Sequence, residues 1–417
     1  QAMYGAVDLI VVGKFAGTAD ISAVSTGSQA MQLVTSLLVG LTTGVTVLLG
    51  QKIGEGRPDE AGSVVGSAIC LFVCVALALT ALLSALTEPF CRLLQAPEEA
   101  FVPTTQYVRI CSAGTLFIVA FNVSGSVFRG LGDSKMPLIT VAIACVTNIF
   151  GDLLLVDVFQ MGAAGAALAT VFAQAVSVIL SLFVIMRRKL PFTFRKEQLR
   201  FDRPLTAGIL RLGIPIALQD VLVGVSFLVI LAIVNSLGLL QSAGMGIAEK
   251  VCAFVMLLPS AFSQSVSAFV AQNTGAGKPE RAKKALRYSV AVSLCISVFV
   301  FYFNFFHGDL LAGIFANDHA VILEAADYLK AYAIDCLLTS FLFCFVGYFS
   351  GLGKTVFVMT QGILGAFGVR IPVSFAMSRL PNVRLFYIGL ATPCSTVVQV
   401  LLCLGYYAHL ARRERRA

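Results

Sequence analysis

The chain has 417 residues, of which 58% are hydrophobic and 12% are charged, and its formal net charge is +8. A soluble globular protein has about half apolar and about a quarter charged residues, so this composition excludes an ordinary soluble domain. The positive charge does not indicate a nucleic-acid partner, because the basic residues lie between apolar segments, where the positive-inside rule places them in membrane proteins.

Twelve apolar segments follow one another along the chain, separated by short clusters of glycine, proline and charged residues. They cover residues 1–16, 23–50, 63–87, 104–128, 136–158, 162–186, 206–235, 239–271, 285–306, 321–349, 355–378 and 385–409. Most of them reach the ~20 residues needed to cross a ~30 Å hydrocarbon core. Only helices and closed barrels satisfy their backbone in lipid, and the sequence lacks the short alternating strands of a barrel. The prediction is an all-α membrane protein with twelve transmembrane helices.

The basic residues predict the orientation of these helices. Loops after even-numbered segments, together with the C-terminal tail, hold 22 of the 30 Lys and Arg residues, and the opposite loops hold four. The positive-inside rule therefore places both termini of this multi-pass protein in the cytoplasm.

The chain contains an internal repeat. The stretches "QKIGEGRPDEA" from Gln51 and "QNTGAGKPERA" from Gln272 are identical at five of eleven positions and begin 221 residues apart. The same offset pairs Tyr107 with Tyr328 and "VFRGLGDS" with "YFSGLGKT". Matches at one spacing indicate two homologous halves of six helices each.

We expect an N-terminal lobe at 1–186, a cytoplasmic linker at 187–205 and a C-terminal lobe at 206–417. Each half contains an even number of helices, so the two share one orientation, as in parallel-repeat transporters that rock around a central cavity. Pro215 would pair with position −6, and we therefore expect the first helix to lack its proline-containing half.

Ionisable side chains inside the apolar segments point to a functional site. A charge at the bilayer centre costs roughly 2.5–3.5 kcal/mol, so it is seldom retained without a role. Asp152 shares a helix face with Asn148, four residues earlier, and Tyr4 and Asp8 repeat that spacing in the first segment. The positions 221 residues after the two aspartates are valines, so the repeat is broken at these acids.

The chemistry of this pair suits ion coupling. Two carboxylates in a low-dielectric pocket cannot both stay ionised cheaply, so the pair can take up a proton or be neutralised by Na⁺. The alternative is that either aspartate only bonds a neighbouring helix. Asn122 and Thr170 are likewise either ion ligands or helix-packing hydrogen bonds.

Four further ionisable residues lie in apolar segments of the second half: Asp220, Lys250, Asp335 and Arg370. They are candidates for lining the central cavity, although long side chains near helix ends can also snorkel to the membrane surface.

With the doubled Q-x-x-G-x-G-[RK]-P, the GLG turns, "VDLIVVGK" and "NIFGD" in place, the chain resembles the prokaryotic multidrug and toxic compound extrusion (MATE) family. The resemblance covers essentially the whole chain apart from the start of helix one. It implies a monomeric transporter of the prokaryotic inner membrane, with twelve helices in two lobes. It also implies secondary efflux of amphipathic, often cationic molecules in exchange for H⁺ or Na⁺, with no other cofactor.

The resemblance also implies a cation site in the N-terminal lobe. Carried over to this chain, its residues are Asp8, Tyr4, Asn122, Asn148, Asp152 and Thr170. For Na⁺ the ligands would come from Asp8, Asn148, Asp152 and Thr170. Members with a second acidic site use a glutamate of helix seven, which "PIALQDVLVG" lacks, and Asp335 lies about a turn from the usual acid of helix ten.

Two other functions compete with efflux. A flippase for a lipid-linked oligosaccharide has a related architecture, but it predicts a more cationic cavity and often extra helices. Residues 129–133 contain the GxGD string of intramembrane aspartyl proteases, yet the charge count places them in a cytoplasmic loop and their repeat copy reads GLGK. We therefore expect a transporter and no enzyme. Ethidium efflux would distinguish a multidrug exporter from a flippase.

Overall fold

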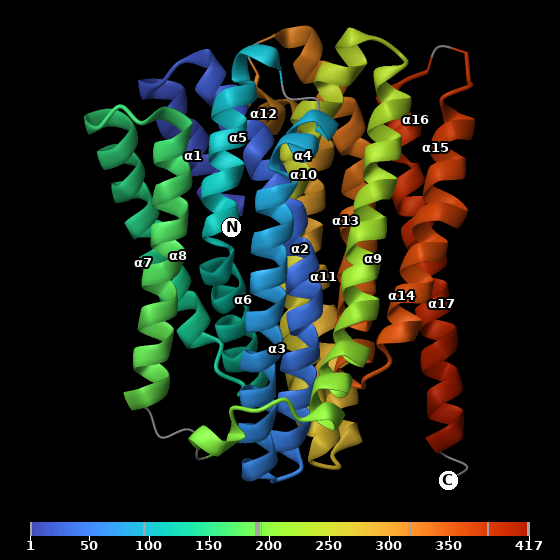
Figure 1. Cartoon of the computed structure of the whole chain (residues 1–417). Helices are drawn as coiled ribbons and strands as arrows, with labels where there is room; N and C mark the ends of the chain where they lie inside the picture. Colours follow the sequence, from blue (N-terminus) through green and yellow to red (C-terminus); the bar gives the residue numbers. More distant parts are fainter. Residues whose placement is uncertain are drawn as a thin grey trace. The chain divides into compact units, whose positions relative to one another are not determined.

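The computed structural model describes residues 2–94, 97–187, 192, 194–316, 318–381 and 383–414, and within these ranges the side chains from residue 7 onward except those of residues 93, 186 and 196. The described segments are helical and contain no strand. The chain divides into an N-terminal unit, Gln1–Ala217, and a C-terminal unit, Leu218–Ala417. Figure 1 shows the order of the helices in both units.

The N-terminal unit contains the helices that follow the first half of the sequence. They are α1 Ala2–Phe15, α2 Thr18–Gly54, α3 Pro58–Ala85, α4 Thr87–Leu93, α5 Glu98–Ala113, α6 Thr115–Gly130, α7 Lys135–Asp152, the π-helix η1 Leu153–Val158, α8 Gly162–Arg187 and the short η2 Lys196–Gln198. Helix α2 packs against α1, α3, α5, α6 and α8, and so forms the centre of this unit.

The C-terminal unit continues from α9 Arg203–Asn235, whose first part belongs to the N-terminal unit. The remaining helices are α10 Leu239–Gly275, α11 Pro279–Phe306, α12 Gly308–Gly313, α13 His319–Gly351, α14 Thr355–Ile363, the π-helix η3 Leu364–Arg370, α15 Ile371–Met377, α16 Leu385–Gly389 and α17 Ala391–Glu414. Helix α13 is central here, because it packs against α10, α11, α14, α16 and α17.

Ten helical stretches of the described chain are long and apolar enough to cross a membrane. The pair α5 and α6, bent by 54° at their junction, counts as an eleventh span. With the 14-residue α1, these stretches follow the twelve predicted segments in order, and their ends differ by a few residues. The predicted all-α membrane fold is therefore confirmed, and the protein is a multi-pass membrane protein.

The repeat is visible in the backbone. Helices α2 and α10 both have 37 residues and begin 221 positions apart, and the 28-residue α3 and α11 follow them at the same offset. Gly56 and Gly277, two residues after the ends of α2 and α10, adopt φ angles of +68° and +65°. Glycine reaches this left-handed region without a Cβ penalty, and it commonly closes helix ends there. The shared motif therefore encodes the same helix–turn–helix in each half.

Candidate functional site

The strongest concentration of buried acidic groups in the N-terminal unit lies where α1, α7 and α8 meet. Helix α1 packs against both other helices. It contributes Asp8, α7 contributes Asn148 and Asp152, and α8 contributes Thr170. Asp152 is 0% exposed, whereas Phe150, two residues earlier, is 69% exposed. Helix α7 therefore turns its polar face inward and an apolar face outward, the arrangement expected of a helix at a lipid boundary.

Asp8 is held by donors from two other helices. The amide Nδ2 of Asn148 donates to Asp8 Oδ1 at 3.1 Å, and the hydroxyl of Thr170 donates to Asp8 Oδ2 at 3.0 Å. Asn148 Nδ2 also lies 3.3 Å from Thr170 Oγ1. Each oxygen of this buried carboxylate thus has a donor, which offsets part of the cost of removing the charge from water.

Asp152 has a different environment. Among the described residues, neither of its carboxylate oxygens has a hydrogen-bond donor, although both are buried. Its carboxyl group lies beside that of Asp8, close enough for the two to share a proton. Asn148 Oδ1 is a further buried acceptor without a donor in the described part of the chain. Buried acceptors are normally paired, so a proton, a cation or an ordered water is expected to complete these three oxygens.

The donor set fits a small hard cation as well as a proton. Carboxylate, amide and hydroxyl oxygens are the ligands that such cations prefer. Asp8, Asp152, Asn148 and Thr170 provide these groups from three helices. Within the described chain, no group of three or more His, Cys, Asp or Glu side chains could hold a metal ion, so a cation here would rely on the two carboxylates together with amide and hydroxyl oxygens.

The helix changes geometry directly after Asp152. Residues Leu153–Val158 form the π-helix η1, and the amide of Phe159 donates to the carbonyl of Leu154, five residues earlier. π-Helical turns are rare and occur frequently at functional sites.

Asp20, at the start of α2, accepts a hydrogen bond of 2.9 Å from the backbone amide of Ala163 and so fixes the start of α8.

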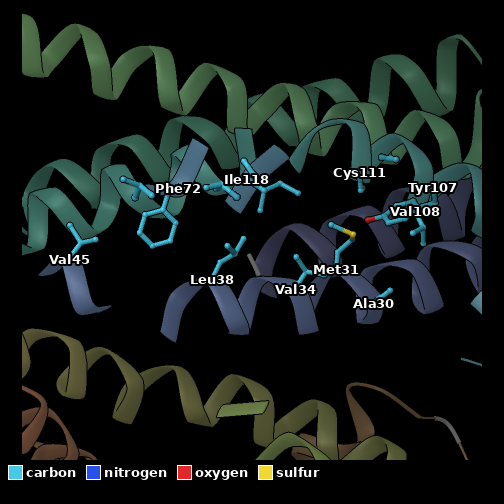
Figure 2. Close-up of a cluster of buried hydrophobic side chains, with 14 of the residues drawn as sticks. Ala30, Met31, Val34, Leu38, Val45, Phe72, Tyr107, Val108, Cys111 and Ile118 are labelled. Atoms are coloured by element: carbon cyan, nitrogen blue, oxygen red, sulfur yellow. The ribbon is translucent and has the colours of Figure 1, made fainter. Parts of the chain in front are cut away.

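Sequence reasoning missed Tyr107 and Cys111 of α5, which lie within electrostatic reach of the acidic pair. Both are buried, and Tyr107 interacts with Cys111 and lies within electrostatic reach of Asp8 and Asp152. Figure 2 shows both residues in the same cluster of buried side chains as Met31 and Ala30 of α2. The only sequence signal at Tyr107 was its pairing with Tyr328 in the repeat.

The other two predicted members of the site, Asn122 and Tyr4, are not placed with this group. Asn122 of α6 is buried, and its amide donates to the carbonyl of Ile118 in its own helix at 2.8 Å. The side chain of Tyr4 lies outside the described residues. The structure therefore brings together Asp8, Asn148, Asp152 and Thr170 of the six predicted residues.

The four candidate residues of the C-terminal unit differ in burial. Asp335 and Arg370 are buried, Asp220 is half-buried and Lys250 is exposed. Glu249, which sequence reasoning missed, is half-buried and lies within electrostatic reach of Cys252 and Tyr328. On α10 it is therefore the glutamate, and not the neighbouring lysine, that faces the interior of the unit.

Comparisons with known proteins agree with this architecture. The probable multidrug resistance protein YoeA of Bacillus subtilis is 24% identical over 422 residues, which cover 100% of this chain and 91% of that protein. A FAD transporter of Shewanella oneidensis is 28% identical over 318 residues, covering 73% of this chain and 69% of the relative.

A solved structure of the outward-facing conformation of a multidrug resistance MATE family transporter superposes with a TM-score of 0.93. It is 18% identical and covers 100% of this chain and 93% of its own, so it bears on the fold alone. The family model MatE matches residues 1–154 and 215–376, one stretch in each half. With both halves of the repeat matched, the chain belongs to the MatE family.

Proposed function

We propose that this protein is a secondary-active efflux antiporter, which exports amphipathic organic cations in exchange for H⁺ or Na⁺. The observation that carries the proposal is the Asp152 carboxylate, buried beside Asp8 with no donor for either oxygen among the described residues. Asp8, Asn148, Asp152 and Thr170 would hold the ion, and Tyr4 and Asn122 remain further proposed members of the site.

The hydrogen bonds support a simple ion step. Asn148 and Thr170 keep Asp8 ready to act as an acceptor. A proton on Asp152 gives that residue a donor, which an Asp8 oxygen can accept, and the buried pair then carries one negative charge instead of two. A sodium ion would lower the charge of the pair equally, with carboxylate and amide oxygens as ligands. In either form, the loaded site is less costly in a low dielectric than the empty one.

Loading the site would then bias the transporter between two states. A ligand shifts a conformational equilibrium only by its difference in affinity for the two states. In our proposal the state open to the ion source favours the loaded acids, and the substrate favours the state in which they are empty. Entry of the ion then displaces the substrate by rocking of the two six-helix lobes. We propose a monomer with both termini in the cytoplasm of a prokaryote.

The proposal also names the class of substrate, an amphipathic organic cation. YoeA is named as a probable multidrug resistance protein, which favours organic drugs, whereas the Shewanella relative is named as a FAD transporter. An anionic dinucleotide therefore has to be compared directly with an organic cation. The 32 phenylalanines of the chain can supply the apolar surface that an amphipathic molecule needs.

The experiment is transport in proteoliposomes loaded with a fluorescent organic cation. Two vesicle sets carry an imposed pH gradient or an imposed Na⁺ gradient, and FAD replaces the cation in a parallel series. We expect transport of the cation with one of the two gradients and its loss in Asp152→Asn. Gradient-driven cation transport by Asp152→Asn at the wild-type rate would overturn the proposal.

A further inference from the structure

Helices α3 and α11 hold the same place in the two halves of the repeat, but the first turns of α3 are covered by other residues. In the N-terminal unit, residues 196–200 lie across them. Gln198 Nε2 donates to the carbonyl of Asp59 at 3.1 Å. The hydroxyl of Ser67 donates to the carbonyl of Arg200 at 3.3 Å, and Ser67 is fully buried. One face of α3 is therefore sealed by a segment of the same chain.

Two glycines of α3 make this cover possible. A Cβ added to Gly66 would collide with the carbonyl oxygen of Gln198, and one added to Gly62 would lie 2.7 Å from Oε1 of the same residue. A backbone approaches a helix this closely only where the helix has no side chain. The cover on α3 therefore depends on residues that α11 would have to share in order to be covered in the same way.

Helix α11 has long side chains where α3 accepts its cover. At the offset of 221 residues, Gly66 pairs with Arg287, and Ser67 pairs with Tyr288, which is 71% exposed. Two further bases on this part of α11, Arg281 and Lys284, are exposed, as is Arg287. The four exposed positions fall within an arc of about 120° around the helix. The face that is sealed on α3 is thus open and basic on α11.

Lys283 lies on another side of α11 and is already paired. Its Nζ lies 2.9 Å from a carboxylate oxygen of Glu280 and 2.6 Å from one of Glu414 at the end of α17. The three exposed bases, in contrast, form no ion pair or side-chain hydrogen bond with the described residues. Glu280 lies within electrostatic reach of Lys284 and Arg287, but it is a single acid that Lys283 also engages. The exposed face therefore keeps an excess of positive charge.

The basic face continues along the helix as an apolar stripe. Val292, Phe299 and Phe306 are exposed and follow Tyr288 at intervals of four and seven residues, which places them on the same side of α11. A tyrosine between basic residues and an exposed apolar stripe is typical of the membrane interface. The basic side chains therefore lie at the depth of the lipid headgroups.

We propose that Arg281, Lys284, Arg287 and Tyr288 bind the headgroup of an anionic phospholipid, which covers α11 where chain residues cover α3. Basic side chains near a membrane surface attract anionic lipids, and guanidinium groups donate paired hydrogen bonds to phosphate oxygens. The acyl chains of the bound lipid lie along the apolar stripe. This site is additional to the proposed transport function and does not depend on it.

The test uses the absence of tryptophan from the chain. Val292→Trp places a single fluorescent reporter one helical turn beyond Tyr288, where the acyl chains of the bound lipid would lie. The protein is reconstituted in mixtures of phosphatidylcholine and phosphatidylglycerol, and in each series one of the two lipids carries brominated acyl chains, which quench tryptophan on contact. The two quenching curves give the relative binding of the lipids. Phe306→Trp, at the other end of the same stripe, is the control reporter.

We expect the Val292→Trp reporter to show a several-fold preference for phosphatidylglycerol, which weakens as salt is added because exposed charges are screened. Changing Arg281, Lys284 and Arg287 together to Gln should reduce the preference to about that of the Phe306→Trp control. Lys284→Gln alone should lower it in part. Lys354→Gln removes the same charge from a different loop and should leave the preference unchanged.

Equal binding of the two lipids at the Val292→Trp reporter would overturn the proposal, and so would a preference that survives the triple change. Quenching by neither lipid would mean that protein covers this face, as in a dimer, and would overturn it too. The salt series needs no substitution at the basic residues. A preference that does not change with salt would therefore overturn the proposal even if the triple variant did not fold.

Discussion

The hydroxyl of Thr170 donates to Asp8 Oδ2 at 3.0 Å, and this hydrogen bond joins the first helix of the N-terminal unit to α8. The acid on α1 is thus held by a residue 162 positions later in the chain. Asn148 holds the other oxygen of the same carboxylate from α7. Three helices therefore meet at one buried charge.

Removing the Thr170 hydroxyl should destabilise the protein by a measurable amount. A hydrogen bond to a charged group contributes about 1.5–3 kcal/mol. Thr170→Val keeps the size of the side chain but leaves Asp8 Oδ2 without this donor, so its Tm at pH 8 should fall. Thr170→Ser retains the hydroxyl and is the matched control, which we expect to unfold near the wild-type temperature. Equal Tm values for the two variants would show that the hydroxyl contributes nothing to stability.

The packing of Tyr107 against α2 depends on a glycine. A Cβ added to Gly27 of α2 would lie 2.4 Å from Cδ1 of Tyr107. Forcing extra volume into a packed interior costs about 1–3 kcal/mol, so Gly27→Ala should lower Tm and displace the tyrosine. Gly224→Ala in α9 is the control, because nothing lies within 4 Å of its added Cβ. The interpretation is wrong if both alanine variants unfold at the same temperature.

The paired turns of the repeat should respond alike to substitution. Gly56 and Gly277 have φ near +65° and open space where a Cβ would lie, so an alanine there suffers only backbone strain. That strain costs about 1–2 kcal/mol at each position. Gly56→Ala and Gly277→Ala should therefore lower Tm by similar amounts, while Gly246→Ala within α10 should not. A large effect in one half only would contradict the equivalence of the two turns.

The architecture could be predicted because its physical causes lie in local patterns. The membrane spans could be located from the lengths of the apolar segments, because a helix must reach a minimum length to cross the bilayer. The glycine and proline positions around Gly56 and Gly277 encode the same turn twice, and the repeat follows from them. Asp152 was detectable because a carboxylate within an apolar helix is costly and is seldom retained without a role.

The rest depended on three-dimensional packing. Tyr107 looks like an ordinary aromatic residue in the sequence, and only the folded structure shows that its ring packs against Gly27 of α2. On α10, Lys250 and Glu249 are adjacent, and no local pattern indicates which of them faces the interior. The contacts of Arg370 with Ser226 and Phe227 join η3 to α9, and no sequence spacing indicates them.

Asp152 is the residue on which the coupling mechanism depends. The release of H⁺ or Na⁺ from this residue when substrate binds can be measured without a membrane. Detergent-solubilised protein in weak buffer receives a saturating organic cation, and release of H⁺ is followed with a pH dye. Displacement of bound radioactive Na⁺ is followed in a parallel sample. Asp157→Asn, in the adjacent η1, is the control for a change of charge in the same segment. The account predicts substrate-induced release of H⁺ or Na⁺ from the wild type and from Asp157→Asn, and none from Asp152→Asn. Undiminished release from Asp152→Asn would contradict it.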